Sequence, residues 1–308
     1  MSRLRERTCA GIAKGRLYCD RIPVMRFFAL VALAMTAFAA NSVLNRMALA
    51  TDAISPTEFA AIRTLAGAVT LLFLLAVQRR RPPLITRGRA LGVVSLTIYM
   101  LGFSLAYLTL DAGLGALILF GMVQLTMFVG GLLGGERVPA ARWAGAVIAL
   151  GGLAFLLWPV GATAPDPLGG VLMGVAGIGW GVYSLAGRNA RDPLAETGAN
   201  FILAAPLTLV PLLLISGGAD PGRSGIVLAI ISGAITSGLG YALWYRVLPR
   251  LVPSLAAIAQ LTVPVLAALG GVAFLGEAPS ARFALATFLV LGGVALSVAA
   301  RDPKPVQN

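Results

Sequence analysis

The chain has 308 residues, of which 58% are hydrophobic and only 12% are charged. Because a soluble domain carries about 25% charged residues, this composition excludes a soluble globular protein. The formal net charge of +12 would suit a nucleic-acid-binding protein, but the basic residues lie in short clusters between long apolar runs, which excludes that class as well.

Apolar runs long enough to cross a bilayer, which takes about 20 residues, follow one another along the whole chain. The connections between them are short and leave no room for a soluble domain. The sequence therefore predicts an all-α integral membrane protein with ten transmembrane helices. The predicted spans are 27–49, 56–77, 90–110, 114–134, 140–158, 168–187, 197–216, 225–247, 252–274 and 281–300.

The basic residues predict how these spans are oriented. Of 24 Lys and Arg residues, 20 lie before the first span, in the loops that follow every second span, or in the C-terminal tail. By the positive-inside rule these segments and both termini are cytoplasmic, which requires an even number of spans.

A turn motif occurs twice. Gly-Gly-Glu-Arg-Val-Pro at 134–139 returns as Gly-Glu-Ala-Pro at 276–279, and a helix with a Gly-Gly pair follows each copy. Five spans per half is an odd number, so the halves are predicted to be inverted repeats, a common architecture for alternating access. We expect four parts: a basic cytoplasmic arm (1–25), a first repeat (26–160), a second repeat (161–300) and a cytoplasmic tail (301–308).

The chemistry of an enzyme is poorly supported. The chain has no histidine, and its two cysteines, Cys9 and Cys19, lie in the basic arm, so no zinc site or Cys–His pair can be built in the bundle. No nucleotide-binding Gly-x-x-x-x-Gly-Lys-Ser/Thr loop is present either. We therefore expect neither an enzyme nor a nucleotide-driven pump, and no cofactor. A start at Met25 would leave the bundle intact.

All twelve acidic residues lie in tails, in loops or near helix ends, so no carboxylate is expected at mid-membrane depth. Proton- and sodium-coupled carriers usually place a carboxylate or a histidine there. We expect a facilitator, with the reservation that backbone carbonyls also bind sodium.

Arg63 is the one charge well inside a predicted span, about two helical turns into the second. A charge at that depth is costly and needs a partner or a water-filled cavity. Two interpretations stay open. Arg63 contacts a substrate carboxylate, or it is a packing anchor that reaches the outer interface or pairs with Glu58 or Asp111.

Mid-helix amide side chains lie in three spans, at Asn41, Gln124 and Gln260. Each suits a hydrogen bond to a solute, and equally one to a neighbouring helix, where such bonds contribute about 0.6–2 kcal/mol. Pro264, near the middle of the ninth span, removes a backbone hydrogen bond and frees the carbonyl of Gln260. This segment is either a wall of the site or a kink that only shapes the bundle.

Several aromatic residues are predicted at mid-depth rather than in the interfacial belts. Ser237, Tyr241 and Trp244 share one helix face through their i, i+4, i+7 spacing. Buried Tyr and Trp need a partner for their polar group, so a cavity lined by them would suit an apolar or aromatic solute. The residues expected to line it are Asn41, Tyr99, Gln124, Trp180, Tyr183, Ser237, Tyr241 and Gln260.

Ten spans in two halves, each with its Gly-Glu turn and Gly-Gly helix, resemble the EamA family of the drug/metabolite transporter superfamily. The resemblance covers residues 26–300. Pro264, thirteen residues before Glu277, fits the pattern, whereas Val123 stands thirteen residues before Glu136, where proline is usual. We expect structural or gating roles for Arg63, Pro264, Glu136 and Glu277.

Within the family, the second half is similar to the YddG-type aromatic amino acid exporters. The similarity rests on Trp180 with Tyr183, on Gly-Tyr-Ala-Leu-Trp at 240–244 and on Leu-Thr-Val-Pro-Val-Leu at 261–266. It implies export of amino acids and related metabolites across the bacterial inner membrane, through a cavity lined by spans 1, 3, 4, 6, 8 and 9.

The sequence thus predicts a multi-pass inner-membrane exporter of small metabolites, above all amino acids with large apolar or aromatic side chains. It would work by alternating access without proton or sodium coupling. We expect a monomer whose partners are its amino-acid substrate and membrane lipid, with no nucleic acid. Two alternatives stay open: a broad-specificity drug or nucleobase exporter of the same superfamily, and a lipid-handling or structural membrane protein.

Overall fold

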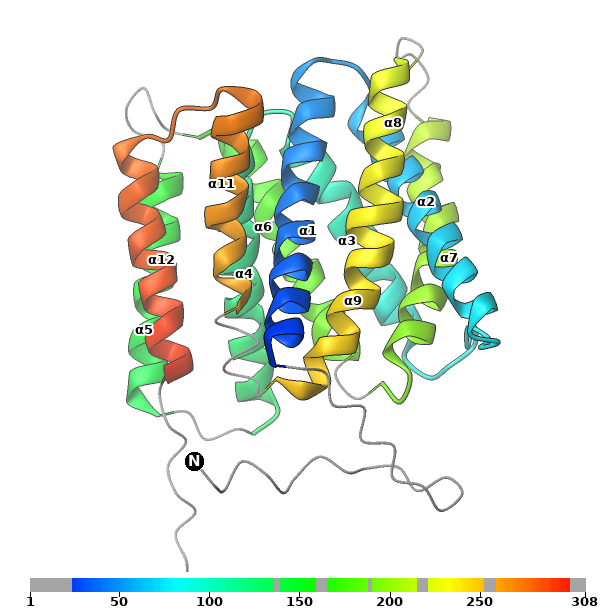
Figure 1. The fold of residues 1–308 in the computed structure, drawn as a ribbon. Helices are drawn as coiled ribbons and strands as arrows, with labels where there is room; N and C mark the ends of the chain where they lie inside the picture. Colours follow the sequence, from blue (N-terminus) through cyan, green and yellow to red (C-terminus); the bar gives the residue numbers. More distant parts are fainter. Residues whose placement is uncertain are drawn as a thin grey trace, which may run out of the picture.

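The computed structural model describes residues 24–135, 139–158, 165–187, 190–214, 221–251 and 259–299. All regular secondary structure in these ranges is helical (Figure 1). Eight helices are long and apolar enough to cross a membrane, and two shorter apolar helices complete the ten predicted spans. The prediction of an all-helical membrane protein is confirmed.

The helices of the first half follow the predicted spans closely. They are α1 (Val24–Ala50), α2 (Pro56–Val77), α3 (Arg89–Ala106), α4 (Ala112–Leu133) and α5 (Ala140–Leu157). Those of the second half are α6 (Pro167–Gly187), α7 (Pro193–Leu214), α8 (Arg223–Ile231), η1 (Ser232–Leu239), α9 (Gly240–Val247), η2 (Leu248–Arg250), α11 (Thr262–Leu275) and α12 (Ala281–Ala299). The ninth span was expected from residue 252, but residues 252–258 lie outside the described ranges.

Local sequence explains two features that matter for the site. Ser55 and Glu58 form a capping box at the start of α2, with Pro56 in the first turn, so Glu58 is used as a cap. The eighth span is continuous from α8 to α9 but is wound as a π-helix over η1. Such segments are rare and occur frequently at functional sites.

The helix contacts follow a twofold pattern. α1 packs against α11 and the eighth span, while α6 packs against α4 and α3. α2 packs against α7, and α5 packs against α12. Exchanging α1 with α6, α4 with α11 and α3 with the eighth span maps the α1–α11 pair onto α6–α4 and the contact of α1 with the eighth span onto α6–α3. The pairs α2–α7 and α5–α12 each map onto themselves when their two helices are exchanged. This is the packing expected of two related five-helix halves.

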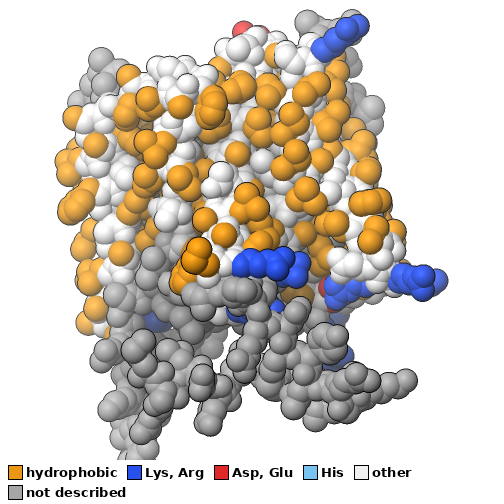
Figure 2. All heavy atoms as spheres, in the orientation of Figure 1, with side chains coloured by type: hydrophobic (Ala, Val, Ile, Leu, Met, Phe, Trp, Pro, Cys, Tyr) orange, Lys and Arg blue, Asp and Glu red, His pale blue; other side chains and the backbone are white. Residues whose placement is uncertain are grey.

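The distribution of polarity is that of a protein in a bilayer. Large apolar side chains cover the flank of the bundle, and basic side chains gather toward its ends (Figure 2). Phe73 and Phe288, for example, are 66% and 75% exposed. Polar side chains such as Asn45, Ser104 and Thr208 are instead fully buried. Burial of the backbone within helices and of polar side chains within the bundle is what the hydrocarbon phase demands.

The α5–α12 pair lies at one edge of the bundle and is held by close glycine contacts (Figure 1, left). A Cβ atom at Gly293 would lie 2.6 Å from the carbonyl oxygen of Gly145 and 2.7 Å from the nitrogen of Ala149. Small residues at such positions let two helix backbones approach, which is the main source of helix association in membranes.

We expect Gly293→Ala to destabilise the protein by about 1–3 kcal/mol, because the added methyl group has backbone atoms on both sides. The neighbouring Gly292 provides a matched control, since nothing lies within 4 Å of a Cβ atom there. Gly292→Ala should be neutral, or stabilising by up to about 1 kcal/mol through helix propensity. Thermal unfolding of both variants in detergent measures the difference. Equal melting temperatures would contradict the proposed role of the α5–α12 contact.

Candidate functional site: a closed aromatic cavity

A small cavity lies where the first, third, fourth, sixth and eighth spans meet. Its volume is about 20 Å³, which is room for about one water molecule. A solute of the size of an amino acid fits only if the walls separate, so the cavity is closed in this structure. Its lining consists of Phe38, Asn41, Ser42, Tyr99, Phe103, Leu119, Phe120, Trp180 and Tyr241.

Trp180 is the centre of the aromatic lining. Its ring centroid lies 5.0 Å from that of Tyr99, 4.9 Å from that of Tyr241 and 5.3 Å from that of Tyr183. Tyr241 in turn meets Phe38 edge-on at 5.7 Å. Offset and edge-on arrangements at these separations are the favoured geometries of aromatic pairs. The rings therefore form one packed surface with contributions from α1, α3, α6 and α9.

Glycines on α6 bring Trp180 to this position. A Cβ atom at Gly177 would lie 2.8 Å from the carbonyl oxygen of Leu119 on α4, and one at Gly179 would lie 2.9 Å from that of Ser95 on α3. α6 is thus pressed against α3 and α4 at the level of the cavity. Small residues at these positions permit this close packing.

A buried polar network lies beside the rings and connects four spans. The Asn41 amide donates to the Tyr99 hydroxyl over 3.4 Å, and its oxygen accepts from Ser232 at 2.6 Å and from Thr236 at 3.1 Å. The Tyr99 hydroxyl also accepts from Nη2 of Arg63 at 2.8 Å. The two hydroxyl groups that donate to Asn41, those of Ser232 and Thr236, come from the π-helix η1.

Arg63 is fully buried. Its Nε atom donates to the Ser237 hydroxyl over 3.1 Å, and its guanidinium carbon lies 5.2 Å and 4.8 Å from the ring centroids of Tyr99 and Phe103. These are cation–π contacts, which strengthen when the pair is desolvated. Among the described residues, Arg63 has only neutral partners.

The expected pairing of Arg63 with the carboxylate of Glu58 or Asp111 is therefore wrong. Glu58 caps α2, and Asp111 lies 3.9 Å from Arg46. Ser237, predicted to line the cavity, contacts Arg63 instead and belongs to the polar network.

The predicted residues divide into those that the structure brings together and those that it does not. Asn41, Tyr99, Trp180 and Tyr241 line the cavity. Tyr183 stacks on Trp180 from behind and donates its hydroxyl hydrogen to Thr197.

Two of the three predicted amides, and the proline, lie away from the cavity lining. Gln124 and Gln260 are half-buried. Pro264 falls in the first turn of α11, just after a turn at Leu261, rather than in mid-helix. Glu136 lies outside the described residues.

Seven residues of the site were not among the expected site residues: Phe38, Ser42, Phe103, Leu119 and Phe120 of the cavity lining, and Ser232 and Thr236 of the polar network. Phe38 lies at i−3 from Asn41, and Ser42 lies at i+4 from Phe38, so a helical wheel would have found Phe38 from the amide and Ser42 from Phe38. Ser232 and Thr236 are spaced i, i+4 and precede Ser237 in the same span. Their spacing shows that two more hydroxyl groups share one helix face close to a predicted site residue.

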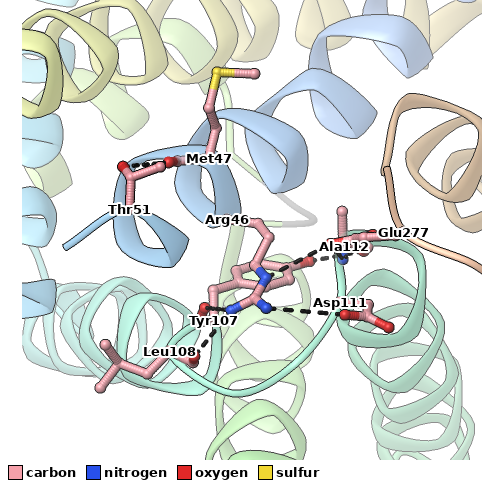
Figure 3. A network of polar contacts seen from close by, with 8 residues as sticks. All are labelled: Arg46, Met47, Thr51, Tyr107, Leu108, Asp111, Ala112 and Glu277. Atoms are coloured by element: carbon pink, nitrogen blue, oxygen red, sulfur yellow. Dashed lines mark hydrogen bonds and ion pairs between the residues drawn. The ribbon is translucent and has the colours of Figure 1, made fainter. Parts of the chain in front are cut away.

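At the end of the bundle where α1 stops, Arg46 ties three segments together (Figure 3). Its Nη1 atom donates to the carbonyl oxygens of Tyr107 and Leu108 at 3.0 and 2.9 Å, and its Nε and Nη2 atoms lie 3.6 Å from Glu277 and 3.9 Å from Asp111. We call Arg46, Asp111 and Glu277 the Arg46 clasp. It connects α1 to the start of α4 and to the turn between α11 and α12.

Glu277 is only partly exposed in this clasp. Both of its carboxylate oxygens accept from the N–H of Ala112, at 2.9 and 3.0 Å. Burial raises the pKa of the Glu277 carboxyl and outweighs the opposing effects of the Ala112 N–H and of Arg46, while Asp111 adds to the rise. A pocket of about 230 Å³ lies beside Glu277 and Asp111, bounded by α4, α11 and Phe283.

A second arginine ties the opposite end of the bundle. Nη2 of Arg89, at the start of α3, lies 2.6 Å from Glu196, and its Nη1 atom donates to Asn200 over 2.8 Å. Both partners belong to the first turns of α7. We call these three residues the Arg89 clasp. The cavity thus lies between two ends that are each tied by an arginine and a carboxylate.

Comparison with known proteins agrees with this architecture. The sequence model of the EamA-like transporter family matches residues 25–158 and 167–299. An uncharacterized protein of Pseudomonas aeruginosa is 48% identical over 281 residues, which is 91% of this chain and 97% of that protein. The uncharacterized transporter YwfM of Bacillus subtilis is 28% identical over 279 residues, or 84% of this chain and 90% of that protein.

The aromatic amino acid exporter YddG of Ancylobacter novellus is 31% identical over 173 residues, 54% of this chain and 59% of that protein. A solved crystal structure covers 91% of this chain and 99% of its own with a TM-score of 0.66 at 23% identity, which shows a shared fold. With ten apolar spans and a family match across both halves, the chain belongs to the EamA-like transporter family and is a multi-pass bacterial membrane protein.

Proposed function

We propose that this transporter exports small metabolites, above all amino acids with large apolar or aromatic side chains, from the bacterial cytoplasm. The observation that carries the proposal is the aromatic surface around Trp180, which lies against the Asn41–Arg63 polar network at the centre of the bundle. Sites for small molecules typically combine apolar walls with a few placed polar groups. The similarity to an aromatic amino acid exporter over about half of the chain supports the same reading.

Transport proceeds by alternating access. The closed cavity and the two clasps correspond to an occluded arrangement, from which one end opens at a time. With both termini cytoplasmic, the Arg46 clasp faces the outside of the cell and the Arg89 clasp faces the cytoplasm.

Transport requires no proton or sodium gradient. Among the described residues, no carboxylate lines the cavity. The acidic residues of both clasps lie at the ends of the bundle, whereas coupled carriers usually hold a carboxylate or histidine at mid-depth.

Counterflow of labelled phenylalanine, tryptophan, threonine and methionine into proteoliposomes, with and without a proton gradient, tests the function. We expect saturable exchange that does not depend on the gradient and is fastest for phenylalanine and tryptophan. Transport of none of the four would contradict the proposal and favour nucleobases or drugs. Accumulation driven by the gradient would overturn the facilitator mechanism alone.

We expect Trp180→Ala to lower the kcat/KM for phenylalanine about tenfold, because Trp180 is the centre of the proposed binding surface and an aromatic contact with the solute is worth about 0.5–1.5 kcal/mol. Trp143→Ala is the matched control, since Trp143 is 49% exposed on α5 and away from the cavity. Equal loss of transport in both variants would argue against a specific role for Trp180.

The raised pKa of Glu277 predicts a pH dependence of stability. The folded state binds this proton more tightly than the unfolded state, so stability is greatest below the ordinary value of 4.5 and falls as pH rises through the raised pKa. Glu277→Gln should remove that fall, which melting temperatures across this pH range in detergent would measure. Asp52→Asn, at an exposed loop residue, should leave the profile unchanged. An unaltered profile in Glu277→Gln would contradict the assignment.

A further inference from the structure

The strongest unexplained feature of the bundle is the charge of Arg63. A guanidinium group carries five N–H donors and is always ionised. Nε and Nη2 donate to Ser237 and Tyr99, but the buried Nη1 atom has no hydrogen-bond partner. A buried charge without a counterion costs several kcal/mol, and the hydrogen bonds and ring contacts to neutral groups offset this cost only in part.

A second donor without a partner lies on the cavity wall, whereas Arg63 lies behind the residues that line it. The hydroxyl of Tyr241 is buried and makes no hydrogen bond of ordinary geometry with the described residues, although the hydroxyl of Tyr99 lies near it. The ring of Tyr241 is part of the cavity wall, packed against Trp180 and Phe38. Buried hydroxyl groups of tyrosine usually find a partner, so this one also needs an explanation.

The two groups are connected through Tyr99. Arg63 donates to the Tyr99 hydroxyl and lies over the rings of Tyr99 and Phe103, which both line the cavity together with Tyr241. When the walls separate, the cavity therefore gains a cation and a neutral hydroxyl, each with a hydrogen-bonding position to fill. A carboxylate offers two acceptor oxygens and one negative charge, and it satisfies both.

We propose that Nη1 of Arg63 and the hydroxyl of Tyr241 form a carboxylate-binding subsite in the central cavity. The transported class is then small carboxylates with an aromatic or large apolar group, and the carboxylate rather than the amino group is required. The inference rests on the proposed function, because it takes this cavity as the transport site. It also predicts that cationic solutes are excluded, since the buried charge of Arg63 beside the cavity would repel them.

Binding of defined ligands to the purified protein in detergent tests the subsite. The ligands are 3-phenylpropionate, its neutral amide and phenethylamine, which share the phenyl group and differ in the polar end. We expect the melting temperature to rise with 3-phenylpropionate, since a ligand that binds only the folded state stabilises it, and to stay unchanged with the other two. Equal stabilisation by the carboxylate and the amide would overturn the proposal.

Tyr241→Phe is the decisive variant because it removes one oxygen that has no partner. Without ligand, its melting temperature should equal or exceed that of the wild type. Its affinity for 3-phenylpropionate should fall about tenfold to a hundredfold, the usual effect of a hydrogen bond to a charged group. A structural role for the hydroxyl would give the opposite pair of results, with lower stability and unchanged affinity.

Tyr107→Phe is the matched control. Its hydroxyl donates to the carbonyl oxygen of Ala112 over 3.2 Å. Tyr107 follows the end of α3, far from the Arg89 clasp at the start of that helix, and it does not line the cavity. This variant should lose stability without any change in affinity for 3-phenylpropionate. An equal loss of affinity in Tyr107→Phe and Tyr241→Phe would overturn the subsite.

Arg63→Gln should abolish the preference for the carboxylate over the amide, and Arg63→Lys should restore part of it, because lysine keeps the charge without the planar fork. If either Arg63 variant fails to fold, Tyr241→Phe still decides. Failure of the two proposals is distinguishable. Phenylalanine transport without carboxylate selectivity would overturn the subsite alone, whereas selective binding of 3-phenylpropionate without transport would overturn the proposed function alone.

Discussion

The placement of one buried positive charge organises the centre of this bundle. Arg63 lies in a region where hydrocarbon surrounds the protein, and it is kept there by the hydroxyl groups of Tyr99 and Ser237 and by the ring of Phe103. These groups come from α3 and η1 and Arg63 itself from α2, so the charge fixes three spans relative to one another. The network stabilises the guanidinium only in part, because every partner is neutral. The spans at the centre of the protein are thereby held together around a buried positive charge that has no counterion among the described residues.

The ends of the bundle work differently from its centre. Arg46 and Arg89 each meet a carboxylate at an end of the bundle, and the four side chains are partly exposed there, whereas Arg63 is fully buried. The ends can therefore rehydrate their charged groups when the clasps separate, while the aromatic and glycine contacts between the spans persist. A closely packed centre with separable contacts at the two ends suits alternating access.

Much of the fold could be predicted from the sequence, because hydropathy reports the cost of placing each residue in lipid. The second span is observed at 56–77, as predicted, and the fifth ends one residue early. The site was harder, because periodicity tells which residues share a helix face but not which face turns inward. Tyr99 and Trp180 lie at the cavity, whereas Gln124 does not line it, although all three have the same mid-span position.

The π-helix η1 shows why the remaining part of the site could not be predicted. A wider turn changes the phase of every later side chain, and its position depends on packing rather than on local propensity. Here the backbone of Gly233 meets the carbonyl oxygen of Arg63, so α2 and η1 are in direct backbone contact. On either side of that contact, Ser232 and Thr236 reach Asn41 while Ser237 reaches Arg63. The eighth span is therefore bonded at once to the amide and to the cation beside the cavity. Any ligand that takes over one of these bonds changes the restraints on this span, which connects occupancy of the cavity to the packing of the helices around it.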